Sequence, residues 1–141
     1  MRFKLYPTHD VDVPFTYLNM SFPTVMRRMI GDVLKRKSVK KAFQTYTNWH
    51  HVAKNEIHYD PVYTFDFIMT ESEKRNLKSA FYFLPSSSPE MTIQYPVTLP
   101  HMQTLLQTID KRGHEIGIHG FYGTYLNNKV FQDDVLLLQA I

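Results

Sequence analysis

Two aspartates and a histidine occur within four consecutive positions near the start of the chain, at His9, Asp10 and Asp12. The apolar run before them alternates as a strand does, and Pro14 ends it. Because side chains alternate between the faces of a strand, Asp10 and Asp12 are expected to point the same way. Crowded carboxylates repel each other unless a cation or a proton lies between them. The pattern therefore favours a metal ligand paired with a general base over an aspartate that only caps a turn.

A further candidate is His119, which ends the segment from His114 to Gly120. This segment is expected to form a short strand, with His114 at its opposite end in a structural role. In parallel sheets, chemistry collects where the C-terminal ends of strands meet loops. We therefore expect His119 to converge with Asp10 and Asp12 on one pocket.

Two helices are predicted directly after the first strand, and together they form a helical insertion at about residues 22–55. Ser21 and Pro23 suit the start of the first helix, and the second is predicted from about Val39 to about Ala53. The first helix is expected to bury one face, because apolar residues recur with helical period at Val25, Met26, Met29, Ile30, Val33 and Leu34.

The rest of the chain alternates helix and strand. Asp60 and Pro61 are expected to cap and begin a helix. Residues 77–84 are nearly all apolar, which is typical of a strand covered on both faces. A serine-rich loop at 85–89 is interpreted as solvated or substrate-facing, and a helix that Gly113 stops follows it. This order predicts an α/β fold with parallel strands and right-handed crossovers.

A last helix is predicted from Val130 to Ile141, and it carries leucines without a capping residue. We interpret residues 1–141 as a single domain that is incomplete at its C-terminus. Three parallel strands form a small sheet with exposed edges. The apolar surface left by such a truncation is expected to pair with another copy, giving a homo-oligomer.

Composition narrows the class of protein. A chain of 141 residues with 43% hydrophobic and 14% aromatic content suits one packed domain. The absence of cysteine excludes disulfides, thiolate metal sites and cysteine nucleophiles. No apolar signal core and no stretch of transmembrane length occurs, so we expect a cytoplasmic protein without a membrane span.

The formal net charge of +3 is unevenly distributed, because five basic residues fall in one short block. We interpret this block as a solvated helix face. Binding of nucleic acid or anionic lipid is the less favoured interpretation, since no basic groove with interspersed aromatic residues accompanies it. The block comprises Lys35, Arg36, Lys37, Lys40 and Lys41.

Short motifs resemble those of the polysaccharide deacetylase family, which shares the nodulation-factor deacetylase homology domain. The segment Thr8 to Asp12 resembles the first family motif in its Asp-x-Asp form, and Gly113 to His119 resembles the approach to the second. Phe81 to Pro85 resembles the strand between them. The resemblance covers most of the chain apart from the helical insertion. It implies the parallel-stranded part of a distorted (β/α) barrel of glycoside hydrolase/deacetylase type.

By this resemblance, Asp10 is the general base, and Asp12 and His119 are ligands of a divalent metal, expected to be zinc. The second histidine of the family motif would stand at position 123, where this chain has Gly123. Catalytic zinc usually has three protein ligands, so the metal is expected to bind weakly. His9, or a group from another part of the whole protein, would have to replace the missing ligand.

The implied reaction is the hydrolysis of acetyl groups from a sugar amide or ester, in cell-surface or capsular glycan metabolism. The later family motifs are absent, so the full-length protein is expected to be the enzyme and this chain alone to be inactive. A non-catalytic carbohydrate-binding or scaffold relative is the alternative: Gly123 supports it, whereas Asp10, Asp12 and His119 oppose it. A nucleic-acid binder acting through Lys35 to Lys41 is a third class, marked by steep salt dependence.

Overall fold

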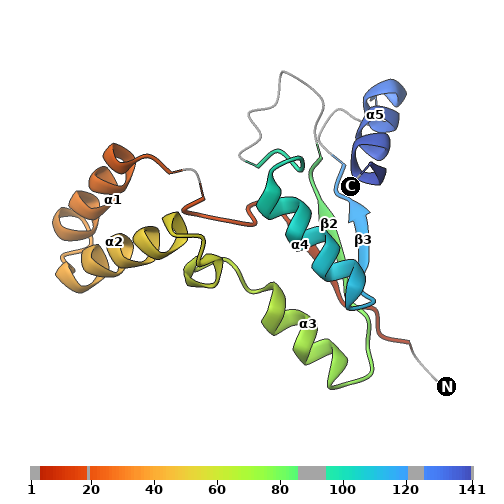
Figure 1. Ribbon diagram of the computed structural model, residues 1–141, viewed down its shortest axis with the longest axis horizontal. Coiled ribbons are helices and arrows are strands. Elements are labelled where there is room, and N and C mark those ends of the chain that lie inside the picture. Colours follow the sequence, from red (N-terminus) through yellow and green to blue (C-terminus); the bar gives the residue numbers. More distant parts are fainter. Residues whose placement is uncertain (1–3, 19, 86–94, 121–125, 141) are drawn as a thin grey trace. The chain divides into compact units, whose positions relative to one another are not determined.

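The computed structural model describes residues 4–18, 20–85, 95–120 and 126–140, which form a mixed α/β protein (Figure 1). The chain divides into two compact units. The first consists of Met1–Val13 together with Phe65–Ile141 and contains the sheet. The second, Pro14–Thr64, contains the predicted helical insertion.

Three short parallel strands form the sheet of the first unit, in the order β1-β2-β3. They are β1 (Thr8–Val11), β2 (Ala80–Phe83) and β3 (Glu115–Ile118), so the predicted parallel pairing is confirmed. The first strand was predicted to include the apolar run before His9, and this predicted start is wrong. Leu5 and Tyr6 precede β1 and are 60% and 70% exposed, because the pairing with β2 begins only where Thr8 meets Ala80.

The two faces of the sheet differ. One face carries His9, Phe81 and Ile116 at the same level, and we call it the covered face. Helix α3 (Phe65–Glu73) packs on it, with the ring of Phe65 5.6 Å from that of Phe81. The opposite, open face carries Thr8, Asp10 and Glu115, which are exposed. Within β2, Phe81 and Phe83 are buried on the covered face, and on the open face Ala80 is buried and Tyr82 half-buried. The expectation that β2 is covered on both faces is therefore met in full on one face and in part on the other.

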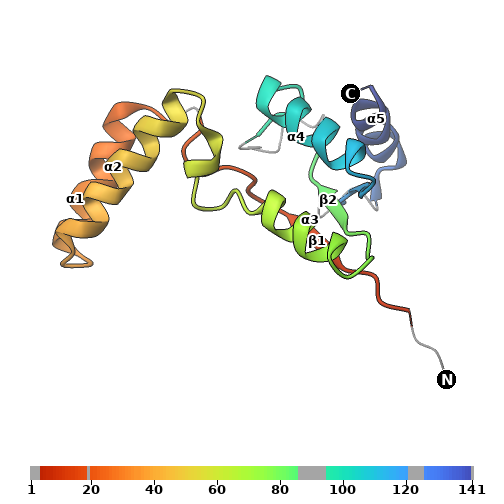
Figure 2. The same cartoon turned by 60° about the horizontal axis from the view of Figure 1, so that its bottom comes forward.

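Two more helices lie against the covered face. Helix α4 (Pro100–Lys111) buries Met102, Leu105, Leu106 and Ile109, as its periodicity predicts. Gly113 follows it at φ 77°, a left-handed conformation that glycine adopts without strain and that ends the helix. Helix α5 (Asn128–Gln139) lies beside β3 (Figure 2), and its Leu138 lines a small cavity together with Leu106 and Ile116.

In the second unit, α1 (Phe22–Leu34) packs on α2 (Val39–Ala53). The predicted bounds of α2 are confirmed. The predicted buried face of α1 is wrong, because only Val25 and Asp32 are buried. Helix α2 covers the side of α1 that carries these two residues and leaves the neighbouring apolar stripe exposed.

Asp60 does not cap a helix, which corrects the prediction for Asp60 and Pro61. It follows the short 3-10 helix Ile57–Tyr59, whereas α3 begins only at Phe65. The buried carboxylate instead accepts hydrogen bonds from the backbone amides of Thr16 and Tyr17, each at 2.7 Å. Asp60 therefore satisfies two amides that are distant in sequence, where the sequence suggested a local cap.

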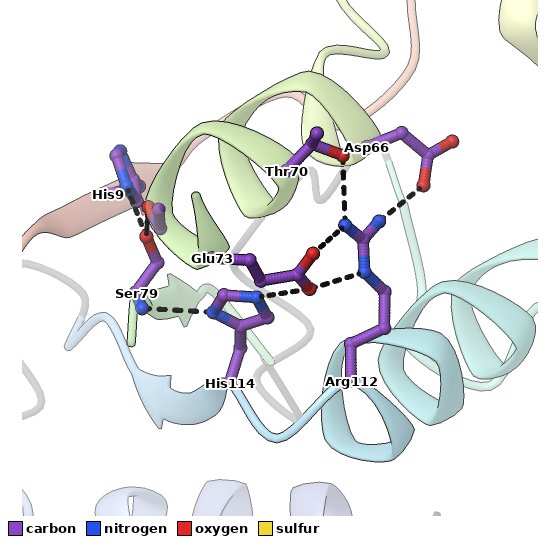
Figure 3. A network of polar contacts seen from close by, with 8 residues as sticks. His9, Asp66, Thr70, Glu73, Ser79, Arg112 and His114 are labelled. Atoms are coloured by element: carbon purple, nitrogen blue, oxygen red, sulfur yellow. Dashed lines mark hydrogen bonds and ion pairs between the residues drawn. The ribbon is translucent and has the colours of Figure 1, made fainter. Parts of the chain in front are cut away.

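An ionic cluster joins α3 to the segment between α4 and β3 (Figure 3). Arg112 donates from Nε and Nη2 to the two carboxylate oxygens of Glu73, at 2.8 Å each, and from Nη2 to Thr70 at 3.0 Å. The buried His114 accepts a hydrogen bond from the backbone amide of Ser79 at Nδ1, so its Nε2 carries the proton that faces Glu73 at 3.2 Å. The structural role predicted for His114 agrees with these contacts.

Replacing Gly117 with alanine is expected to destabilise the fold by about 1–3 kcal/mol. An added Cβ at Gly117 would lie 2.5 Å from ring carbons Cδ1 and Cε1 of Tyr82. Urea unfolding of Gly117→Ala measures the cost. Gly31→Ala is the control: an added Cβ at Gly31 meets nothing within 4 Å, so this helix-interior change is expected to stabilise by about 0.5–1 kcal/mol. Equal effects of the two changes would contradict the Tyr82 contact.

Replacing Glu73 with glutamine is expected to lower stability at neutral pH and to flatten its dependence on pH. Hydrogen bonds from Arg112, and then from His114, lower the pKa of Glu73 to about 2. The unfolded carboxyl titrates near 4.5, so its stabilisation is complete above that pH and is lost as the pH falls towards about 2. Unfolding free energies across this window test the effect. Glu115→Gln, on the open face, should leave the slope of the wild-type chain unchanged.

Candidate functional site

Two residues of the predicted site, Asp10 and His119, lie at the C-terminal end of the sheet. Asp10 lies in β1 in register with Tyr82 of β2 and Gly117 of β3. His119 follows β3 directly, and its backbone amide donates to the carbonyl of Phe83 at 2.6 Å. This hydrogen bond extends the β2–β3 ladder beyond the last paired residue. It sets the position of His119 at the C-terminal end of the strands.

Asp10 and His119 converge, although 108 positions separate them in the sequence. Oδ2 of Asp10 lies 3.8 Å from Nε2 of His119, with the side chains 64% and 35% exposed. This separation is too long for a hydrogen bond. It is short enough for one cation with bonds of about 2.0–2.2 Å to contact both atoms. The pair can therefore interact as an ion pair or share a bound cation.

The other ring nitrogen of His119 has an unusual environment. Nδ1 is buried and makes no hydrogen bond within the described residues. Leaving such an atom unpaired costs about 1–3 kcal/mol, and buried polar atoms in proteins are nearly always satisfied. Within the described residues this nitrogen is therefore left unsatisfied, and an imidazole nitrogen can serve in general as a proton donor or as a ligand of a divalent metal.

Asp12 lies one residue beyond β1, where its side chain is exposed. The structure does not pair it with His119. Its negative charge acts instead on Tyr95, whose pKa is raised first by burial and then by Asp12. Among the described residues, no group of three histidine or acidic side chains could hold a metal ion. The predicted ligands Asp12 and His119 therefore do not by themselves complete a metal site.

Three other sequence expectations concern the same region. His9, the suggested replacement ligand, faces away from Asp10 because side chains alternate along β1: its ring stacks on Phe81 at 5.1 Å on the covered face. Its Nε2 lies 3.2 Å from Oγ of Ser79, and burial lowers its pKa. Gly123 and most of the serine-rich loop, residues 86–89, lie outside the described residues.

Tyr95 is a residue of the site that the sequence reasoning missed. Its buried hydroxyl donates to the carbonyl of Val11 and accepts from the amide of Leu84 at 3.1 Å. One side chain thus ties the C-terminal ends of β1 and β2 together, beside Asp10 and Asp12. A single tyrosine in an irregular segment carries no local signal for this role, since both partners are backbone groups of distant strands.

No protein-family model, curated protein sequence or solved structure matches the chain. The geometry of the site must therefore carry any assignment of function.

Tyr95→Phe is expected to destabilise the protein by about 1–3 kcal/mol, because it leaves a buried carbonyl and a partly buried amide without their partner. Chemical unfolding measures the loss, and amide exchange at Leu84 should accelerate if the hydroxyl protects it. Tyr6→Phe is the matched control, because the side chain of Tyr6 is 70% exposed. Equal stability of the two variants would show that the Tyr95 hydroxyl does not hold the strand ends.

Proposed function

We propose that the protein is a metal-dependent hydrolase that removes acetyl groups from a sugar or polysaccharide, as an amide or an ester, in cell-surface or capsular glycan metabolism. One observation carries the proposal: Asp10 and His119 lie 3.8 Å apart at the C-terminal ends of parallel strands. Parallel α/β folds place their catalytic groups at this edge. The resemblance of the two motifs to those of polysaccharide deacetylases supplies the substrate class.

We further propose that the sheet is part of a distorted (β/α) barrel. The strands follow one another in chain order, and the helices that connect them pack on one face. A barrel grows in this way, with helices outside and strand ends forming the active-site rim. In a doubly wound sheet, the strand order reverses and helices cover both faces. The open face that bears Asp10 would then point into the barrel.

Within this proposal, Asp10 accepts the proton of the attacking water. A carboxylate suits that task because it is acceptor-only when ionised and can lie within reach of a water at the strand end. His119 and Asp12 are the proposed metal ligands, and the metal supplies polarisation of the acetyl carbonyl. A third protein ligand has to come from outside the described residues, because those residues hold no group of three.

The contact between Asp10 and His119 allows a second arrangement at the same site. If Asp10 binds the metal together with His119, it is unavailable as a base. The non-catalytic alternative, a carbohydrate-binding or scaffold relative, requires neither role. It is favoured by Gly123 at the position of the second family histidine.

Zinc titration by calorimetry is expected to show weak binding to this chain, lost in His119→Ala and in Asp12→Ala. Asp10→Asn should keep the metal affinity, because a base does not hold the ion. Asp133→Ala, an exposed carboxylate on α5, is the control and should bind zinc as the wild-type chain does. Loss of binding in Asp10→Asn would reassign Asp10 as a ligand.

In the full natural protein, acetate release from chitin oligosaccharides and from acetylated xylan tests the activity. We expect turnover that falls by a factor of about 10²–10⁴ in Asp10→Asn, the usual contribution of a general base. Oligosaccharide binding without acetate release, unchanged in all three site variants, would contradict the hydrolase and support the non-catalytic alternative.

A further inference from the structure

The hairpin of α1 and α2 exposes a row of large apolar side chains. Four of them recur at every fourth position of α1, and two recur in the same way on α2, so each set forms a stripe along its helix. We call the six side chains together the apolar face, and between 37% and 73% of each is exposed: Phe22, Met26, Ile30, Leu34, Val39 and Phe43.

The two stripes lie on the same side of the hairpin. Helix α1 turns Val25 and Asp32 towards α2, and α2 turns Ala42 and Thr45 towards α1. At 100° per residue, each stripe is rotated by about a third of a turn from the buried side, in the direction of increasing residue number. Because the helices run antiparallel, these equal rotations bring both stripes to one side.

At one end of the apolar face, aromatic contacts join the start of α1 to the end of α2. The ring of Phe22 lies 5.7 Å from that of Trp49, and the Trp49 indole donates to the carbonyl of Met20 at 2.9 Å. The start of α1 is thereby fixed against the end of α2. The face is a continuous surface on a rigid helix pair, not a set of scattered residues.

The same unit is strongly basic. Residues 14–64 contain eight lysines and arginines against three acidic residues, whereas the rest of the chain contains eight against ten. Most of the eight lie on α1, on α2 or in the turn between them. Lys35, Lys40 and Lys41 are exposed there. The positive charge of the chain is therefore concentrated on the unit that exposes the apolar face.

The single acidic residue of the hairpin offsets only one of these positive charges, that of Arg36. Asp32 is 1% exposed and accepts hydrogen bonds from Thr45 and Arg36. The bond from Thr45 is the first cause that lowers its pKa, so the carboxylate stays ionised inside the hairpin. To its surroundings the hairpin presents apolar groups and positive charge.

We propose that the α1–α2 hairpin docks on the surface of an anionic lipid bilayer. Helices with Lys and Arg on the polar side and bulky apolar residues on the other lie in the plane of the membrane interface. Each basic side chain near an anionic surface adds attraction, and long basic side chains reach headgroup phosphates while their stems stay apolar. No helix in the described part of the chain is long and apolar enough to cross a bilayer. The proposed attachment is peripheral, through the apolar face and the basic side chains, and it is independent of the proposed hydrolase.

Charge favours this occupant over a second copy of the chain. Two apolar faces packed together would bring two units of the same excess positive charge into proximity. An anionic lipid surface instead complements the charge and covers the apolar side chains at once.

Vesicle flotation of the whole chain tests the proposal. We expect the protein to float with vesicles of phosphatidylcholine and phosphatidylserine and to stay unbound with phosphatidylcholine alone. Binding should weaken as salt rises, because salt screens the lipid charge. Absence of flotation with the anionic vesicles, or equal binding to both compositions, would overturn the proposal.

Two matched substitutions locate the contact. Phe43→Asp is expected to weaken vesicle binding by about tenfold or more, since it removes an aromatic ring that the bilayer would bury and adds a negative charge. Phe67→Asp, on α3, is the control, because Phe67 is 68% exposed and Phe43 is 67% exposed. It should bind vesicles as the wild-type chain does. Equal loss in both variants would overturn the assignment of the hairpin.

Two double charge-reversal variants test the contribution of the basic side chains. Lys40→Glu with Lys41→Glu should reduce binding at least as strongly as Phe43→Asp, whereas Lys78→Glu with Lys111→Glu should retain it. Circular dichroism confirms that each variant is folded.

Sedimentation velocity without lipid tests whether a second copy covers the apolar face instead. A dimer that Phe43→Asp dissociates would show that it does, and this result would also overturn the proposal.

Discussion

The first unit depends on the ionic cluster around Glu73. This carboxylate at the end of α3 receives Arg112 from the end of α4 and faces His114 at the entry to β3. His114 in turn accepts the amide hydrogen of Ser79 at the entry to β2. The bond from Ser79 to His114 is buried, so leaving either group without its partner would be costly. The two bonds from Arg112 to Glu73 lie near the surface and are charge-assisted. Together these contacts connect both helix-to-strand junctions at one end of the sheet. Helices α3 and α4, which these contacts join, both lie on the covered face of the sheet.

The ionic cluster lies at the N-terminal ends of the strands, and the candidate site lies at their C-terminal ends. There the strand ends are held by backbone groups and by one hydroxyl: His119 donates to Phe83, and Tyr95 links Val11 to Leu84. Asp10 and His119 are brought together by the register of three strands rather than by a bond between them. Such a site can accept a bound group without breaking existing contacts, as the proposed hydrolase requires.

The second unit is stabilised by a different principle. Asp32 and Asp60 are buried, and each is satisfied by hydrogen bonds from its own unit. Hydrogen bonds from several donors offset the cost of burying each carboxylate. Asp32 joins α1 to α2 through Thr45, and Asp60 holds the segment before α1 through Thr16 and Tyr17. The apolar stripe of α1 takes no part in these contacts. This separation of core from surface is what leaves the apolar face available to a partner.

The sequence by itself determined the elements whose signals are local. Helical periodicity and Gly113 predicted α4, because these signals depend on neighbours a few residues away. The alternating order of helices and strands predicted the parallel sheet, because parallel strands need a crossover connection between them. The tertiary structure alone decided which face of α1 is buried, that Asp60 binds distant amides, and that Tyr95 ties two strands. It also decided that His119 meets Asp10 and not Asp12. Each of these depends on strand register and helix packing between residues far apart in the chain, and no short pattern encodes such distances.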